Sequence, residues 1–380
     1  MNKIRFVGLD VHAETISVAI AEPGRCGEVR FLGTIPNRIE SVKKIFKKIG
    51  SAEKLRVCYE AGPTGYALYW LLTEMGLECE VVAPTLVPVK AGDRVKTDRR
   101  DAEKLARSYR AGDLTPVWVP DAEHEALRDL MRARLAAKRD QLRAKHRLSK
   151  FLLRHGKRPE KGIRAWTKAY LNWVKTEVRF DQLAQLVTLD DYVHEVEHAQ
   201  DRIDRLEQYI DDAIERMPEK MRAVVEALQA LRGIAKISAA TIVAELGEVS
   251  RFSKPRQLMG YSGAVSSEYS SGERTCRGSI TKTGNAHLRR VVVEAAWSYR
   301  HRPCISYKLA ARQKAASQQV KEIAWKAQHR LHRRYYRLLA TGKTKQKVVT
   351  AVARELLGFI WDIGVTVERE HSNSKQTRAA

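Results

Sequence analysis

The chain has 380 residues and a formal net charge of +24, with 69 lysine and arginine residues against 45 acidic ones. Such a length allows two or three domains, each with its own hydrophobic core. The positive excess makes nucleic acid the expected partner. No apolar run reaches the length of a membrane span, and the first residues contain no apolar signal-peptide segment. We therefore expect a cytosolic protein with no membrane partner.

Cysteine usage points to the same compartment. The five cysteines, at positions 26, 58, 79, 276 and 304, contain no C-x-x-C pair and form no even framework. This pattern predicts buried thiols in a reducing environment rather than disulfides.

The positive charge is concentrated in two tracts. Residues 138–175 contain 13 lysine and arginine residues and two acids, and residues 300–347 contain 14 and one acid. Together these tracts account for the whole net charge. Solvated helix faces usually intersperse acids with bases, so the tracts favour two nucleic-acid contact surfaces.

The first 120 residues alternate β-rich and helical segments. Runs at 4–10, 16–20 and 29–32 predict three consecutive strands, with the Pro23-Gly24 turn before the third. Further along the chain we expect a helix at 39–49, a strand at 55–59, a helix at 66–74, a strand at 79–82, and a helix capped by Thr97. This order predicts an α/β domain built on a mixed sheet, spanning residues 1–120.

Residues 121–220 are predicted to form a long-helical region with a basic insert. One helix runs from about 121 to 155 and a second from about 181 to 216. The second has apolar residues at coiled-coil spacing: Val196, Ala199, Ile203, Leu206, Ile210, Ala213 and Met217. We expect the two helices to pack as an antiparallel pair that helps the protein to dimerise. Trp166, Tyr170 and Trp173 have helical spacing and favour a core over a base-stacking surface.

Residues 221–340 are expected to form a compact helical domain, followed by a helical extension and tail at 341–380. The segment from Leu231 to Ile242 resembles a helix-hairpin-helix, whose turn offers backbone N–H groups to phosphate. Ala235 replaces the usual second glycine there. Residues 260–285 are rich in glycine and serine and predict a long loop, and such loops are usually either functional or disordered.

Four acidic residues fall where the predicted sheet would bring them together. Asp10 and Glu60 end two strands, whereas Asp98 and Asp101 leave the same face of one helical turn. Acids in a first turn also suit the helix dipole, which is an alternative reason for the last two. Oxygen-only ligands suit Mg²⁺ or Mn²⁺, and a pair of such ions would hold both reacting oxygens of a phosphoryl transfer.

Four motifs carry a family resemblance over nearly the whole chain. They are Gly-Leu-Asp10-Val-His, Tyr-Glu60-Ala-Gly-Pro-Thr-Gly, Lys-Thr-Asp98-Arg-Arg-Asp101-Ala, and the segment from Glu268 to Asn285. In this order they resemble the DEDD-type insertion-sequence transposases, the IS-one-ten (IS110) family, also known as bridge-RNA recombinases.

The resemblance implies a fold, a chemistry and partners. It implies a RuvC-like N-terminal domain of ribonuclease H fold, long coiled-coil helices and a helical C-terminal transposase domain, hence α/β plus α overall. Asp10, Glu60, Asp98 and Asp101 would be catalytic and would bind Mg²⁺, or Mn²⁺. Ser271, directly before Gly272, would be the nucleophile, with Ser270 as the neighbouring alternative. The implied partners are donor and target DNA, a structured guide RNA, and further copies of the chain as a dimer or tetramer.

Other functions remain open at the level of sequence. A RuvC-like structure-specific nuclease would use water in place of Ser271, and a catalytically inert protein would only bind nucleic acid through the basic tracts. The sequence His194-Glu-Val-Glu-His198 matches the H-E-x-x-H zinc motif. It lies on the acidic coiled-coil helix, which favours a chance match.

Overall fold

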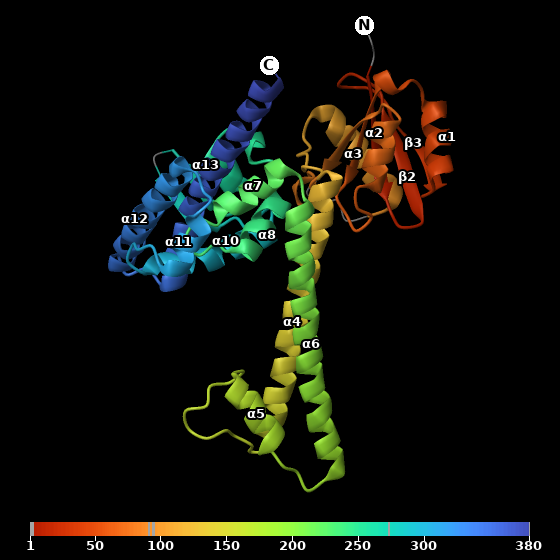
Figure 1. The fold of residues 1–380 in the computed structure, drawn as a ribbon. Helices are drawn as coiled ribbons and strands as arrows, with labels where there is room; N and C mark the ends of the chain where they lie inside the picture. Colours follow the sequence, from red (N-terminus) through yellow and green to blue (C-terminus); the bar gives the residue numbers. More distant parts are fainter. Residues whose placement is uncertain (1–3, 90–91, 93–95, 273, 380) are drawn as a thin grey trace. The chain divides into compact units, whose positions relative to one another are not determined.

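The computed structural model describes residues 4–89, 92, 96–272 and 274–379, and only the backbone of 374–379. The chain forms two compact units, Met1–Val119 and Pro120–Ala380 (Figure 1). The finer divisions at about residues 220 and 340 stay predictions. Glu273, inside the predicted serine loop, lies outside the described residues.

The first unit is built on a mixed five-stranded sheet with the strand order β3-β2-β1-β4-β5. The first three strands pair antiparallel, whereas β4 runs parallel to β1 and β5 runs parallel to β4. The strands are β1 (Arg5–Val11), β2 (Thr15–Ala21), β3 (Val29–Pro36), β4 (Leu55–Glu60) and β5 (Glu78–Val82). All five predicted strands are therefore confirmed, with ends that differ by at most a few residues.

Three helices accompany this sheet: α1 (Ile39–Ile49), α2 (Ala67–Glu74) and α3 (Asp98–Ala111). Two short 3₁₀ helices, η1 (Ala52–Lys54) and η2 (Pro84–Leu86), lie in the connections. Helix α3 packs closely against β1, because Gly8 has no side chain at the contact. A Cβ at Gly8 would lie 2.4 Å from the Ala106 nitrogen and 2.5 Å from the Ala102 oxygen. The buried Ala102 and Ala106 complete this contact.

The prediction of buried thiols is wrong for three of the five cysteines. Cys58 and Cys79 are buried in β4 and β5, but Cys26, Cys276 and Cys304 are exposed. The exposed three lie in a turn, in a solvent-exposed strand and in a loop. A thiol is buried here when its cysteine lies in a core strand, and the number and spacing of the cysteines do not predict this.

The second unit begins with two long helices, α4 (Ala122–Arg154) and α6 (Leu183–Arg216), which pack along each other (Figure 1). They run antiparallel, since Arg134 pairs with Glu207 and Arg147 pairs with Glu195. This confirms the predicted antiparallel pair. The coiled-coil seam packs within one chain: Val196, Ala199, Ile203 and Ile210 are buried, while Leu206, Ala213 and Met217 are partly buried. Dimerisation stays a prediction.

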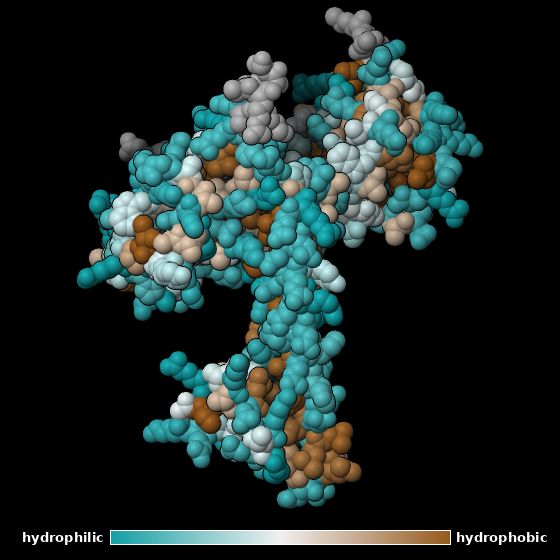
Figure 2. All heavy atoms as spheres, in the orientation of Figure 1, coloured by the Kyte–Doolittle hydropathy of each residue, from teal (hydrophilic) through white to brown (hydrophobic). Residues whose placement is uncertain are grey.

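A short helix, α5 (Lys168–Thr176), packs on this pair and forms a local core with it. Tyr170 and Trp173 are buried there, and Trp166 packs against the same cluster. The predicted core role of these aromatic residues is confirmed. The visible face of the α4–α6 pair is mostly hydrophilic, with a hydrophobic area where α6 begins (Figure 2). Leu183 and Val187 are exposed in this first part of α6.

The largest hydrophobic core lies among the helices that follow. Its helices are α7 (Glu219–Leu228), α8 (Lys236–Leu246), α9 (Pro255–Tyr261), α10 (Ala286–Ala296), α12 (Gln318–Ala340) and α13 (Lys345–Ala379). The short helix α11 (Tyr307–Gln313) lies between α10 and α12 in the sequence. The 3₁₀ helices η3 (Val249–Arg251) and η4 (Trp297–Arg300) connect some of these helices. Val348, Leu356 and Ile363 of α13 are fully buried in this core. Among the described helices, none is long and apolar enough to cross a membrane.

The prediction of a long loop at 260–285 is wrong. This segment contains a two-stranded antiparallel hairpin, β6 (Ser266–Ser271) and β7 (Arg274–Ile280). Nearly every residue of both strands is exposed. An apolar face is the sequence signal of a half-buried strand, and this hairpin has none. The backbone groups that face the partner strand pair in the ladder between β6 and β7.

A buried carboxylate anchors the segment that follows the hairpin. Glu245 of α8 is fully buried. Arg132 of α4 donates to both of its oxygens at 3.0 Å, and the Asn285 amide donates to Oε2 at 2.7 Å. Asn285 also caps α10, because its side chain accepts a hydrogen bond from the Leu288 N–H. Glu245 therefore ties α4, α8 and the start of α10 together at the exit of the hairpin.

Candidate active site

Two acidic residues meet at one edge of the sheet in the first unit. Because β1 and β4 are parallel neighbours with Leu9 opposite Tyr59, the residues that follow, Asp10 and Glu60, lie at the same edge. Both lie near the ends of their strands, directly after the buried residues Leu9 and Tyr59, where the chain reaches solvent. The carboxyl ends of parallel strands are a common place for ligand binding in α/β sheets.

The other two acids come from the first turn of α3. The Thr97 hydroxyl accepts a hydrogen bond from the Arg100 N–H, so the predicted cap is present. Asp98 is exposed on this turn, with 60% of its side chain accessible, whereas Asp101 is 23% accessible. Lys96 lies 3.9 Å from Asp101 Oδ2. The close packing of α3 on Gly8 brings this turn toward Asp10.

The acids influence one another electrostatically. Partial burial raises the pKa of Asp10, and the charges of Asp101 and Asp98 raise it further, while His12 opposes the shift. Burial likewise raises the pKa of Glu60, with contributions from Asp10 and Asp101 that Lys96 partly offsets. Each carboxylate thus lies in the field of others, which costs free energy unless a cation compensates. A group of this kind is suited to a divalent metal ion.

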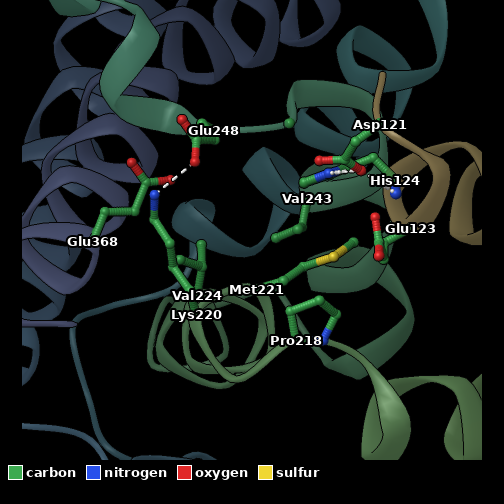
Figure 3. Close-up of a pocket in the computed structure, with 11 residues that line it drawn as sticks. Asp121, Glu123, His124, Pro218, Lys220, Met221, Val224, Val243, Glu248 and Glu368 are labelled. Atoms are coloured by element: carbon green, nitrogen blue, oxygen red, sulfur yellow. Dashed lines mark hydrogen bonds and ion pairs between the residues drawn. The ribbon is translucent and has the colours of Figure 1, made fainter. Parts of the chain in front are cut away.

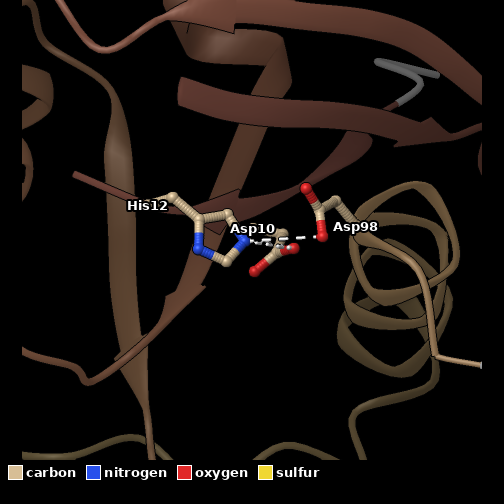
Figure 4. A group of neighbouring side chains, drawn as sticks. All are labelled: Asp10, His12 and Asp98. Atoms are coloured by element: carbon tan, nitrogen blue, oxygen red, sulfur yellow. Dashed lines mark ion pairs between the residues drawn. The ribbon is translucent and has the colours of Figure 1, made fainter. Parts of the chain in front are cut away.

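One member of the group was not predicted from the sequence. The His12 Nε2 atom lies 3.3 Å from Asp10 Oδ2 and 3.6 Å from Asp98 Oδ1, facing both carboxylates (Figure 4). Asp10, His12 and Asp98 each offer a ligand atom, and these atoms lie within 4.8 Å of one another. The sequence could have indicated this histidine, because His12 stands two residues after Asp10 in the first motif. Its side chain is directed toward Asp98 only by the fold.

The predicted nucleophile lies on the exposed hairpin of the second unit. Ser271 is the last residue of β6, opposite Arg274, and precedes Gly272 at the turn. The neighbouring Ser270 hydroxyl donates to Glu268 Oε1 at 2.8 Å, and Arg277 contacts the other oxygen of Glu268 at 3.3 Å. Among the described residues, the Ser271 hydroxyl has no hydrogen-bond partner. The two serines therefore differ in hydrogen bonding: the Ser270 hydroxyl is bound to Glu268, and the Ser271 hydroxyl is bound to no described residue.

Comparison with known proteins points to the same function as the cluster of carboxylates and the positive charge of the chain. Residues 7–156 match a family model described as a transposase of the IS110 DEDD type. Residues 225–309 match the model described as "Transposase IS116/IS110/IS902 family". A putative transposase of Sinorhizobium fredii, y4qE, is 47% identical over 360 residues, covering 94% of this chain and 88% of the relative. The chain belongs to the IS110 family of insertion-sequence transposases.

A second relative supports the same membership. The transposase for insertion sequence element IS1533 of Leptospira borgpetersenii is 30% identical over 343 residues, covering 89% of this chain and 97% of that protein. Membership makes this transposase an enzyme of DNA cleavage and transfer, with DNA as a partner. The DEDD family also suggests a divalent metal, in agreement with the acidic cluster at Asp10.

In both basic tracts of the transposase, most cations have no acidic partner among the described residues. In the first tract, Arg147 and Lys175 pair with Glu195 and Glu197 of α6, so this helix offsets part of the charge of α4 and α5. The second tract shows the same pattern. Arg330 and Arg334 share Glu355, but Lys326, Arg333 and Arg337 of α12 have no acidic partner among the described residues. These five cations line a hollow of about 470 Å³ together with His329 and Glu355.

A separate acidic cavity in the second unit is structural in character (Figure 3). It has a volume of about 130 Å³. Asp121 caps α4 by accepting from the His124 N–H, and Glu368 accepts from the N–H groups of Val249 and Ser250 at 2.7 and 2.8 Å. Lys220 pairs with Glu248 at 2.6 Å. The carboxylates of Asp121, Glu248 and Glu368 are thus engaged in holding backbone and side-chain partners, unlike the carboxylates around Asp10.

Proposed function

We propose that this transposase cuts and rejoins DNA through a transient bond between Ser271 and a DNA phosphate. Asp10, Glu60, Asp98 and Asp101 hold Mg²⁺, with Mn²⁺ as a substitute, and a structured non-coding RNA guides the choice of DNA. The first unit then has a RuvC-like ribonuclease H fold. The observation that carries the proposal is the meeting of Asp10 and Glu60 at the carboxyl edge of the parallel strands, with Asp98 and Asp101 on the adjoining helix.

The donor set fits a hard divalent cation. It consists of four carboxylates, and two of them, Asp10 and Glu60, have pKa values raised by burial and by the charges of their acidic neighbours. Binding a cation among them relieves this repulsion. Asp10 lies in both groupings: its oxygen is close to those of His12 and Asp98, and its charge raises the pKa of Glu60. When bound, divalent ions stabilise the charge that develops on the attacking and leaving oxygens of a phosphoryl transfer.

Ser271 is favoured over Ser270 as the nucleophile. The Ser270 hydroxyl is donated to Glu268, whereas that of Ser271 is directed to no described residue. The Ser271 Oγ–P bond forms as the P–O bond to the leaving sugar oxygen breaks. The serine proton passes to solvent and the leaving oxygen takes up a proton. Reversal of this step by a sugar hydroxyl of the partner DNA rejoins the strands and releases the serine.

The two separate basic tracts support contacts with two nucleic acids, a guide RNA and DNA. The first tract covers the second part of α4 and α5, and much of the second lies on α12, so one can contact mainly RNA and the other mainly DNA. Each neutralised phosphate adds to the salt dependence of binding. Assembly as a dimer or tetramer would bring donor and target DNA together. Sequencing the RNA that co-purifies with the protein tests the guide, and light scattering tests the assembly.

Trapping a covalent adduct tests the central step. Full-length protein is incubated with end-labelled transposon-end DNA and Mg²⁺, denatured, and analysed for labelled protein. The wild type and Ser270→Ala are expected to form the adduct, whereas Ser271→Ala forms none, because a methyl group cannot attack phosphorus. Nucleic-acid binding should be unchanged in both variants, which serve as matched controls for each other.

The other outcomes select the alternatives. Cleavage by Ser271→Ala without any adduct would indicate a RuvC-like nuclease that uses water. Binding without cleavage by the wild type, over a range of DNA ends, would indicate a non-catalytic nucleic-acid-binding protein. An adduct that persists in Ser271→Ala and disappears in Ser270→Ala would move the nucleophile to Ser270. Mixing Ser271→Ala with Asp98→Asn protein tests whether the serine and the carboxylates can come from different copies, because a mixed assembly contains one intact set of each.

A further inference from the structure

The imidazole of His12 has an unusual position in the acidic group. Its Nε2 atom faces Asp10 on its own strand and Asp98 on α3, at 3.3 and 3.6 Å (Figure 4). These two acids are separated by most of the first unit in sequence, and the histidine lies against both. An exposed histidine that served no purpose here could turn its ring to solvent, since 53% of its side chain is accessible.

The backbone beneath the ring is firmly fixed. The His12 N–H donates to the Thr15 carbonyl at 2.9 Å, which closes the turn between β1 and β2. The His12 carbonyl accepts a hydrogen bond from the Asn37 side chain at 2.8 Å. On the strand before it, Asp10 is in register with Ser17 of β2. The backbone that carries the imidazole ring is therefore held in place beside Asp10 by these hydrogen bonds.

The spacing of the three ligand atoms matches a coordination sphere. Divalent ions bind oxygen and nitrogen at about 2.0–2.2 Å, so neighbouring ligand atoms around one ion lie about 3.0–3.5 Å apart. The His12 nitrogen lies 3.3 and 3.6 Å from its two carboxylate neighbours, within a group that spans less than 4.8 Å. No large rearrangement of these side chains is needed to place an ion among them.

We infer that His12 is a direct metal ligand of this transposase, so that one ion is held by two carboxylates and one imidazole. The inference rests on the proposed metal-dependent function and adds a nitrogen donor to its carboxylate set. Carboxylate and water oxygens suit both Mg²⁺ and Mn²⁺, whereas an imidazole nitrogen is a donor for transition-metal ions, of which Mn²⁺ is one and Mg²⁺ is not. His12 thus tunes the site toward Mn²⁺ relative to Mg²⁺, a preference that four carboxylates alone would not give.

Bound Mn²⁺ reports its own ligands, which gives a test independent of activity. Full-length protein is loaded with Mn²⁺, and pulsed electron paramagnetic resonance detects the modulation from a directly bound imidazole ¹⁴N. The wild type is expected to show this signal. His12→Ala and His12→Asn should lose it, and calorimetry should show Mn²⁺ binding weakened by about tenfold or more and Mg²⁺ binding by about threefold or less, by analogy with donor preferences.

His194→Ala is the matched control, because it removes an exposed imidazole from the second unit. It should leave both the nitrogen signal and the Mn²⁺ affinity unchanged. A wild-type spectrum without imidazole nitrogen, or one that survives in both His12 variants, would overturn the inference. Equal losses of Mn²⁺ and Mg²⁺ affinity in the folded variants would also overturn it, since a mere counter-ion role has no metal preference.

The failure of this inference is distinguishable from failure of the proposed function. If Asp10→Asn and Asp98→Asn abolish Mn²⁺ binding but the nitrogen signal is absent, the carboxylate site stands and only His12 is excluded. If neither substitution weakens Mn²⁺ binding, the carboxylate metal site itself is wrong. The Ser271 adduct is measured separately in both cases.

Discussion

Two carboxylates of this transposase have opposite electrostatic surroundings. Glu245 is fully buried, and burial alone would raise its pKa, yet hydrogen bonds from Arg132 and Asn285 with the charges of Arg132 and Arg128 lower it. Asp10 is less buried, but its pKa is raised by burial and by the neighbouring acids Asp101 and Asp98. Burial favours a raised pKa at both carboxylates, so it does not explain why their pKa values move in opposite directions. The sign of the neighbouring charges explains this difference.

The difference indicates what each carboxylate is for. Glu245 is already compensated by cations from its own chain, so it can bind nothing further and serves to connect helices. The charges around Asp10 are only partly compensated. His12 lowers the pKa of Asp10, but burial and the charges of Asp101 and Asp98 together still leave it raised. A group that is repelled within the fold and accessible from solvent is prepared for a cation from outside.

The largest expected effect comes from removing one charge of the Asp10 group. Asp98→Asn should reduce DNA cleavage by about a thousandfold or more, because a phosphoryl transfer depends on the charge that the metal ligands hold in place. The same substitution should leave the melting temperature of the metal-free protein unchanged or slightly higher, since it relieves repulsion. Cleavage of labelled transposon-end DNA and thermal unfolding measure the two effects.

Glu14→Gln is the matched control for that substitution. Glu14 is an exposed acid of the turn between β1 and β2, and its side chain has no ion-pair partner among the described residues. Its replacement should preserve cleavage. Retained cleavage in Asp98→Asn, or a large loss of stability in that variant, would contradict the distinction between the two carboxylates.

A smaller effect, on stability rather than chemistry, is expected at Glu245. Glu245→Gln removes the charge that compensates Arg128 and Arg132, and breaking a buried pair costs about 3–5 kcal/mol. Chemical denaturation of the full chain measures this loss. The control is Glu248→Gln, because Glu248 is exposed and pairs only at the surface with Lys220. Surface pairs contribute about 0–1 kcal/mol, so similar losses in both variants would refute the structural role of Glu245.

The smallest expected effect is the pH dependence of the Glu245 contribution. Its folded-state pKa is lowered from the ordinary value of 4.5. A lowered pKa means that the stabilisation is fully present above the unfolded pKa and disappears as the pH falls through the folded pKa. The stability difference between wild type and Glu245→Gln should therefore be constant near neutral pH and smaller at pH 3.

Denaturation curves of both proteins from pH 7 to pH 3 give this difference directly. Acid unfolding through other groups cancels in the comparison, because the two proteins differ at one residue. A difference that grew on acidification would mean that Glu245 is protonated more readily in the folded state. Its environment would then resemble that of Asp10.

Much of the local structure follows from the sequence. The short β-rich runs at 4–10, 16–20 and 55–59 predict β1, β2 and β4, because strands that are largely buried are rich in apolar residues. Thr97 predicts the start of α3 because a side-chain oxygen can satisfy a free N–H of the first turn. The seam of α6 predicts its pairing with α4. The positions of Asp10, Glu60, Asp98 and Asp101 at strand ends and a helix start follow from the same local signals.

Three features depended on tertiary structure. The hairpin β6–β7 was mistaken for a loop, because strands that bury neither face have no apolar period to read. The cations that compensate Glu245 come from α4, far away in sequence, so nothing near Glu245 shows which charges neutralise it. His12 joins the acidic group only because Gly8 lets α3 approach β1 closely enough to bring Asp98 beside it. Local sequence sets each residue's secondary structure, but contacts between distant segments decide which charges meet, since those contacts depend on packing that no local pattern contains.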